Sequence, residues 1–131
     1  MIRILFDIFI ILHGLIHLLY LGQSSRLFEL QPGMVWPDRS WAFSRFFTEK
    51  TTEKIANACL ILTALLFFVG GTCQLIGKDW WRLVVSLAAI ISTILFILFW
   101  DGSLKKLADQ GWVGILINLA ILAVVHLIRW P

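Results

Sequence analysis

The chain has 131 residues, of which 60% are hydrophobic and 15% are charged, and its mean hydropathy is +0.88. Soluble domains average about 45–50% apolar and about 25% charged residues, so a water-soluble core of this length could not bury so much apolar surface. The net charge of +3 is small and its basic residues are scattered, which excludes a nucleic-acid-binding surface. We therefore expect one small domain over residues 1–131 that is embedded in a lipid bilayer.

Four apolar runs are long enough to cross a membrane, which takes about 20 residues of helix. They cover about residues 2–21, 54–76, 80–100 and 112–130. Trp80, Trp81, Trp100, Trp112 and Trp130 lie at the ends of these runs, and indole side chains favour the membrane interface. The sequence thus predicts an all-α integral membrane protein, a four-transmembrane-helix bundle with both termini on one side.

The first connection, residues 22–53, is much longer than the others, and loops of this length usually have a function or contain structure. Its segment "WPDRSWAFSRFF", residues 36–47, clusters aromatic residues on one face of a helical projection. We predict a short amphipathic helix there that acts as a lid over the mouth of the bundle. Thr51 or Thr52 is the predicted N-cap of the second span.

The connection between the third and fourth spans has the sequence "DGSLKKLADQG", residues 101–111. Leu104 and Leu107 would form one face of a helical turn and the two lysines the other. The pattern predicts a short interfacial helix that ends at Gly111.

The stretch "ILHGLIHLLY", residues 11–20, places two histidines one helical turn apart within an apolar run. At about 100° per residue, His13, His17 and Tyr20 share a sector roughly 60° wide. Polar groups inside a membrane rarely face lipid, so this sector should face the interior of the bundle with neutral imidazoles.

Polar residues of the other spans fall at similar depths on the long-loop side, judged from a rise of about 1.5 Å per residue. The predicted ligand-binding set is His13, His17, Tyr20, Asn118, Thr63 and Thr93. Ser92 falls at the same depth. The alternative is that these groups only join helices by hydrogen bonds, and for single Thr and Ser residues bonding to the backbone is the default.

Asp7 and His126 fall at nearly the same depth on the other side of the membrane midplane. An aspartate inside a membrane should have a partner, so we predict a structural polar pair between the first and fourth spans. Two alternatives are a proton relay and an Asp7 side chain that reaches the interface beside Arg3.

The histidines favour some cofactors over others. His13 and His17 lie on one helix and cannot sandwich a haem iron, so haem is less favoured. No third strong ligand accompanies the two histidines, so a metal ion is also less favoured and no metal site is predicted. A neutral histidine between flat apolar walls suits a quinone or another lipophilic carbonyl compound. No nucleophile–base constellation indicates catalysis, so whether the protein is an enzyme stays open.

The four short spans, the long first connection and the polar sector of the first span resemble DoxX-like membrane proteins in layout. The segments "HGLIHLLY", "WPDRSWAFS" and "FWDG" look like parts of small prokaryotic membrane proteins. The family includes subunits linked to quinone-dependent sulfur oxidation. The resemblance implies a prokaryotic cytoplasmic membrane and a redox partner, and it assigns no catalytic residue.

Two functions follow as hypotheses. The first is binding of a lipophilic small molecule, such as a quinone, within a membrane redox system. The second is an accessory or structural subunit without chemistry of its own. The expected partners are the lipid bilayer, a lipophilic ligand, and a membrane protein or a second copy of the chain, but no nucleic acid.

Overall fold

The computed structural model describes residues 1–130, and this part of the chain is helical without strands. Its four main helices are α1 (Ile2–Ser24), α2 (Glu49–Leu75), α3 (Trp81–Leu98) and α4 (Trp112–Ala123). A 3₁₀ turn, η1 (Leu107–Gln110), precedes α4, and a π-helical turn, η2 (Val124–Ile128), continues it. The all-helical prediction is confirmed.

Three helices are long and apolar enough to cross a membrane. They are α1, α2 and α3, with 23, 27 and 18 residues and mean hydropathies of 2.0 to 2.2. The fourth apolar helix, Trp112–Ile128, is shorter, with 12 residues of α-helix and 5 of π-helix. At about 1.5 Å per residue it is about 25 Å long, a little less than the hydrocarbon core of a typical bilayer.

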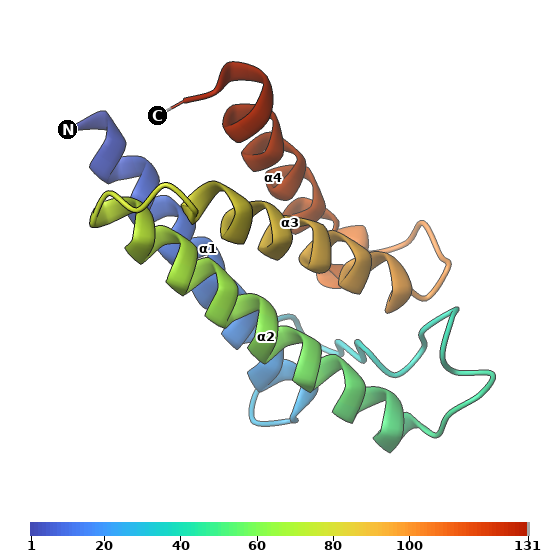
Figure 1. Cartoon of the computed structure of the whole chain (residues 1–131). Helices are drawn as coiled ribbons and strands as arrows, with labels where there is room; N and C mark the ends of the chain where they lie inside the picture. Colours follow the sequence, from blue (N-terminus) through green and yellow to red (C-terminus); the bar gives the residue numbers. More distant parts are fainter. Residues whose placement is uncertain (131) are drawn as a thin grey trace.

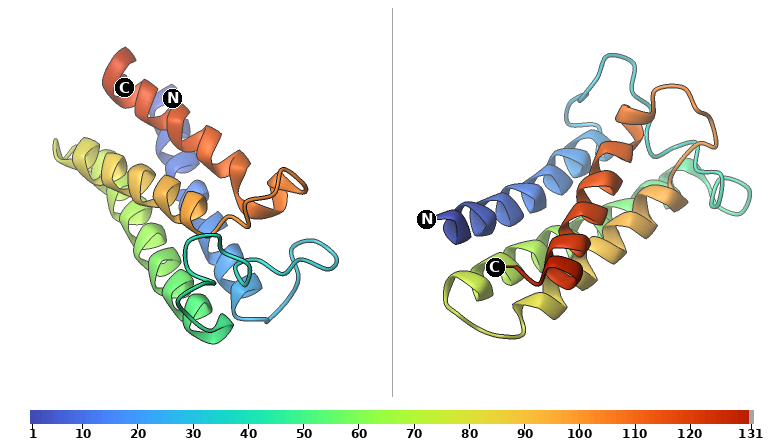
Figure 2. Two further views of the ribbon diagram at one scale, coloured as in Figure 1. Left: turned by 90° about the vertical axis from the view of Figure 1, so that its right-hand side faces the viewer. Right: turned by 90° about the horizontal axis from the view of Figure 1, so that it is seen from above.

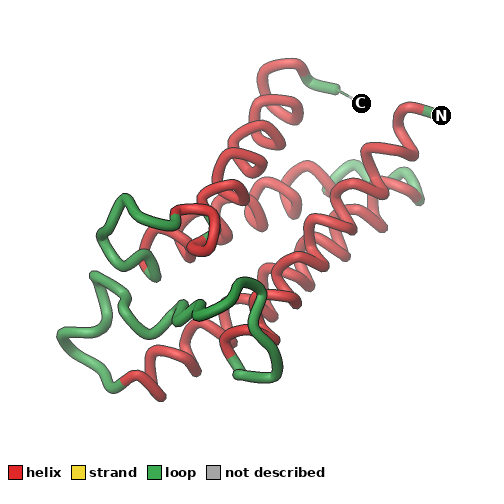
Figure 3. The backbone as a smooth tube through the Cα atoms, turned by 180° about the vertical axis from the view of Figure 1, so that it is seen from behind, coloured by secondary structure: helices red, strands yellow, loops and turns green. Residues whose placement is uncertain are grey.

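Consecutive helices run in opposite directions and pack in chain order, α1 along α2, α2 along α3, and α3 along α4 (Figure 1). The two further views agree that the N- and C-terminal ends lie at the same end of the molecule (Figure 2). The long connection and the connection that leads to α4 lie together at the opposite end (Figure 3). We call this opposite end the loop end, and the other the terminal end.

The second helix begins earlier than its apolar run. Thr48 is the N-cap, with its hydroxyl oxygen accepting a hydrogen bond from Thr51 N at 3.3 Å. The predicted caps Thr51 and Thr52 are therefore wrong. The apolar run marks the part of the helix that lipid can surround, whereas the cap is set by the first side chain that satisfies the free N–H groups.

No helix forms between α1 and α2, so the predicted amphipathic helix in residues 36–47 is wrong. This segment is a series of turns bound to the end of α3. Trp41 Nε1 donates to Ile97 O at 2.7 Å and Trp41 N donates to Trp100 O at 2.8 Å, while the Ser40 hydroxyl donates to Leu98 O. These bonds attach the segment to backbone carbonyls at and just beyond the end of α3, the region where a helix leaves carbonyls free.

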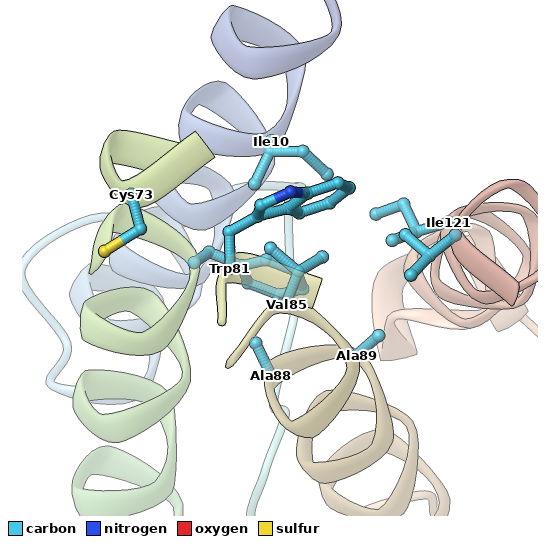
Figure 4. Packing of buried hydrophobic residues seen from close by; sticks show 9 residues of the cluster. Ile10, Cys73, Trp81, Val85, Ala88, Ala89 and Ile121 are labelled. Carbon is cyan, nitrogen blue, oxygen red and sulfur yellow. The ribbon is translucent and has the colours of Figure 1, made fainter. Parts of the chain in front are cut away.

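The core consists of two hydrophobic clusters. The cluster near the terminal end contains Ile10, Phe67, Cys73, Trp81, Val85, Ala88, Ala89, Ile121 and Val125. Figure 4 shows Trp81 between Ile10 and Val85, with Ile121 approaching from α4. The cluster near the loop end contains Met34, Trp36, Ala56, Leu60, Leu95, Phe96, Phe99 and Ile115. The loop therefore contributes Met34 and Trp36 to the core and covers the loop end of the bundle.

The predicted interfacial helix between α3 and α4 is present only as the single turn η1. It ends at Gly111, as predicted, with φ of +83°. This left-handed backbone conformation favours glycine, which has no Cβ to clash.

Candidate functional site

Between the two hydrophobic clusters lies a buried layer of four polar side chains. His13 and His17 come from α1, Ser92 from α3 and Asn118 from α4, and their side chains are 0 to 2% exposed. The His17 ring contacts Phe67 of one cluster and Phe96 of the other, with centroids 5.4 and 5.8 Å away. The layer therefore joins three helices at the level where the two clusters meet.

The hydrogen bonds of this layer form a circuit whose direction can be assigned. A carbonyl only accepts, so His17 Nδ1 donates to His13 O at 3.0 Å, and in the neutral ring His17 Nε2 accepts from the Ser92 hydroxyl at 2.7 Å. Ser92 Oγ accepts from Asn118 Nδ2 at 2.8 Å, and Asn118 Oδ1 accepts from His13 Nε2 at 2.8 Å. Every donor in the circuit thus has an acceptor while both imidazoles are neutral.

The circuit directs the histidines toward other protein groups. One nitrogen, His13 Nδ1, is buried and has no hydrogen-bond partner. In the assigned tautomer it is an acceptor, so it offers a ligand carbonyl no hydrogen bond. The arrangement is therefore the interhelical bonding that the sequence left open as the alternative to a ligand site.

The other predicted ligand-binding residues lie apart from the circuit. Thr63 donates to Cys59 O and Thr93 to Ala89 O, both at 2.8 Å within their own helices. Tyr20 lies nearer the loop end, where its hydroxyl donates to Ala108 O at 3.2 Å. The structure thus brings together His13, His17 and Asn118, with Ser92, and leaves out both threonines.

Asp7 and His126 do not form the predicted pair. His126 Nε2 donates to Ser86 Oγ at 2.7 Å, while the Ser86 hydroxyl donates to Arg82 O at 2.7 Å. Asp7 is 1% exposed and its Oδ1 has no partner. The depth estimate gives a position along the membrane normal and does not show which helix His126 faces. Because α4 packs along α3, the partner of His126 comes from α3.

A hollow of about 560 Å³ lies at the loop end, between the long loop and the connection that leads to α4. Its lining residues are Gly33, Met34, Val35, Trp36, Pro37, Arg39, Phe99, Asp101, Ser103, Lys105, Lys106, Asp109 and Gln110. We call it the larger hollow. It has apolar and aromatic walls with a charged rim, which is typical of a site for a small amphipathic molecule.

A second hollow of about 320 Å³ adjoins the first and shares Met34 and Asp109 with it. The remaining lining residues are Ile16, Leu19, Tyr20, Leu30, Gln31 and Ala108. We call it the smaller hollow. Tyr20 is thus a predicted site residue that lines a hollow, whereas His13, His17 and Asn118 line neither of these two.

Two buried glutamines fix the walls of the larger hollow. Gln23 accepts from Leu30 N at 2.9 Å and donates to Met34 O at 3.1 Å, which holds the long loop. Gln110 accepts from Asp101 N at 2.8 Å and donates to Lys105 O at 3.2 Å, which holds the opposite wall. Both walls are therefore held by bonds to backbone groups.

An ion pair between Arg26 and Asp38 also ties the long loop. Burial raises the pKa of the Asp38 carboxyl, and the Arg26 guanidinium beside it lowers that pKa in part. The two side chains are 41% and 20% exposed, so the ion pair adds little, whereas Gln23 holds the long loop from a position that is 1% exposed.

Trp36 is a buried residue that lines the larger hollow, and we call the part of the hollow at Trp36 its floor. Trp36 is 4% exposed, and its indole Nε1 is buried without a hydrogen-bond partner. Its ring contacts Tyr20 with centroids 5.1 Å apart and Phe96 with centroids 5.8 Å apart. Phe96 in turn contacts His17, so aromatic rings connect the hollow with the circuit.

Sequence reasoning missed Trp36, Phe99 and the basic residues of the rim as site residues. One signal was available. Five of the seven tryptophans lie at the ends of apolar runs, whereas Trp36 and Trp41 lie within the long loop, where preference for the interface at a span end does not account for them.

Across residues 1–130 no three His, Cys, Asp or Glu side chains gather as a metal ion would require. Comparison of the chain with protein-family models, with curated proteins and with solved structures gives no match. The proposals below therefore depend on the geometry of the chain itself.

Proposed function

We propose that this protein is a four-span protein of a prokaryotic cytoplasmic membrane that binds a lipophilic carbonyl compound, of the quinone class, for a membrane redox system. The observation that carries the proposal is the aromatic lining of the larger hollow together with the indole N–H of Trp36, one of its lining residues, which is buried without an acceptor. Buried donors nearly always have acceptors, so an unpaired donor beside a cavity favours a ligand that accepts a hydrogen bond there.

The chemistry of the walls supports this class of ligand. A flat ring can lie against Trp36 and Phe99, with Met34 and Pro37 completing an apolar surface. The donor is then Trp36, in place of the histidines expected from the sequence, because the circuit already engages the donor groups of His13 and His17. The resemblance to DoxX-like proteins supplies the redox context.

The alternative function is an accessory subunit without its own chemistry. The circuit favours it, because four buried polar groups joined across α1, α3 and α4 are sufficient to explain the histidines as structural residues. The alternative leaves the larger hollow and the unpaired Trp36 donor without a role.

Titration with a short-chain benzoquinone should distinguish the two functions. In detergent, we expect the quinone to quench tryptophan fluorescence saturably, and Trp36→Phe to weaken its binding about tenfold, since one lost hydrogen bond of about 1.4 kcal/mol has this effect. Trp80→Phe is the matched control, because Trp80 is 50% exposed in the turn between α2 and α3 at the terminal end.

Thermal stability of each variant is measured alongside, so that unfolding is separated from loss of binding. Quenching that does not saturate in the unaltered protein, or equal affinity of the Trp36→Phe and Trp80→Phe variants, would reject the quinone site and favour the accessory subunit.

The four-span topology predicts which positions share a membrane side. In a background without Cys59 and Cys73, a membrane-impermeant thiol reagent should label Phe46→Cys and Leu104→Cys from one side, and Lys78→Cys and Arg129→Cys from the other. All four of these sites are exposed, with Phe46 at 79% and Leu104 at 80%.

The position at Arg129 tests the short fourth helix. Labelling of Arg129→Cys from the same side as Leu104→Cys would show that Trp112–Ile128 does not cross the bilayer. A shorter helix can still span a membrane by local thinning of the bilayer, so we expect the crossing.

A further inference from the structure

Three cations meet at the rim of the larger hollow. Arg39 comes from the long loop, and Lys105 and Lys106 come from the connection that leads to α4. Within residues 1–130 the only ion pair is Arg26–Asp38, so none of the three has a salt-bridge partner.

Asp101 and Asp109 also line the larger hollow, and these two acids do not cancel the charge of the three cations. Asp101 Oδ1 accepts a hydrogen bond from Ser103 N at 2.7 Å, and Asp109 borders both hollows. Three cations against two acids leave the lining with a net positive charge. Such a rim attracts an anion, and the field is strongest in a cleft with apolar walls.

The smaller hollow continues from this rim along α1. Its apolar residues include Ile16 and Leu19, which are 39% and 49% exposed, and Leu30 of the long loop. Because α1 is one of the helices that can cross a membrane, these exposed side chains face the region that lipid chains occupy. A charged compartment thus adjoins a mainly apolar one, with Met34 and Asp109 lining both.

We propose that the joined hollows bind an anionic membrane lipid, with its phosphate among Arg39, Lys105 and Lys106 and an acyl chain in the smaller hollow. Basic pockets at the level of lipid head groups are a known way to select anionic lipids. This site uses the rim and the smaller hollow, whereas the carbonyl site uses the floor at Trp36, so the lipid site does not depend on the proposed quinone function.

Native mass spectrometry of the protein exchanged into mixed phosphatidylglycerol and phosphatidylcholine micelles tests the proposal. We expect phosphatidylglycerol to be retained preferentially, and Lys105→Gln and Lys106→Gln each to reduce its retention about fivefold, the effect of about 1 kcal/mol for each basic residue. Lys78→Gln is the matched control, because Lys78 is an exposed lysine in the turn at the terminal end.

A second substitution separates binding from folding. Lys106 has a φ of +52°, a left-handed conformation that glycine adopts without strain. Lys106→Gly should therefore keep or raise thermal stability and still reduce retention of phosphatidylglycerol about fivefold through the lost charge. A loss of binding in this variant cannot then be ascribed to an unfolded loop.

Several outcomes would overturn the lipid site. The first is equal retention of phosphatidylglycerol and phosphatidylcholine, and the second is a loss of phosphatidylglycerol retention in Lys78→Gln as large as in the Lys105 and Lys106 variants. The third is displacement of the lipid by inorganic phosphate alone, which would mean that the acyl chain contributes nothing. The quinone titration is a separate fluorescence measurement, so either site can fail while the other stands.

Discussion

Replacing Gly111 with alanine is expected to lower the free energy of unfolding by about 3 kcal/mol, since a left-handed residue that gains a Cβ costs about 1–2 kcal/mol and an overpacked core costs about 1–3 kcal/mol. A Cβ at Gly111 would lie 2.1 Å from Phe96 Cδ1 and 2.5 Å from Phe96 Cγ. Reversible unfolding in mixed micelles measures the difference.

Gly114→Ala provides the matched control. Gly114 lies one turn further along the chain and faces the same ring, but a Cβ there would be 3.6 Å from Phe96 Cε2, an ordinary contact. Alanine is the better helix former, so this variant should be neutral or up to about 1 kcal/mol more stable. Equal losses in the two variants would contradict the close approach of Gly111 to Phe96.

The ring of Phe96 links this glycine to the candidate site. Phe96 contacts Tyr20 with centroids 5.0 Å apart, and it also contacts Trp36 and His17. A shift of the ring would therefore disturb the floor of the larger hollow. Gly111→Ala should for that reason weaken quinone binding as well as stability, whereas Gly114→Ala should leave both intact.

Three helices that can cross a membrane were predictable because hydrophobicity over about 20 residues is a direct consequence of lipid as solvent. The residues at which the helices begin and end could not be predicted in the same way. The last apolar run extends to Trp130, but the helix ends at Ile128, where Arg129 adopts a left-handed φ of +54°. Apolar composition does not record where the backbone leaves the helix, and the capped start of α2 at Thr48 shows the same at the other boundary.

The site was predictable in part. The spacing of His13 and His17 placed both rings in the interior, and the depth estimate placed Asn118 beside them, as the structure has them. Depth and phase on single helices do not determine which helices are neighbours, so His126 was assigned to Asp7. The larger hollow depends on how two loops meet, through bonds such as that from Gln110 to Lys105 O, and no periodic pattern predicts such contacts.

Replacing Asn118 with leucine should be the most costly single change in the circuit. Leucine keeps the volume of the side chain but removes two hydrogen bonds, and it leaves the His13 Nε2–H without an acceptor in a buried place. An unpaired buried donor costs about 1–3 kcal/mol, and single hydrogen bonds inside membranes average about 0.6 kcal/mol, so we expect a loss of about 2 kcal/mol. Thr63→Val and Thr93→Val are the controls, because both hydroxyls bond only within their own helices.

A double-mutant cycle then separates a structural circuit from a ligand site. Once Asn118 is leucine, His13→Phe removes a donor that already lacks its acceptor, so the two losses should sum to more than the loss in the double variant. Quinone affinity should stay within about twofold in all three proteins, because the proposed binding donor is Trp36 and one lost hydrogen bond would change affinity about tenfold. Additive losses of stability would contradict the bond between His13 and Asn118. A tenfold loss of affinity with unchanged stability would instead return His13 to the ligand site, because a histidine that only joins helices has no means of weakening binding without weakening the fold.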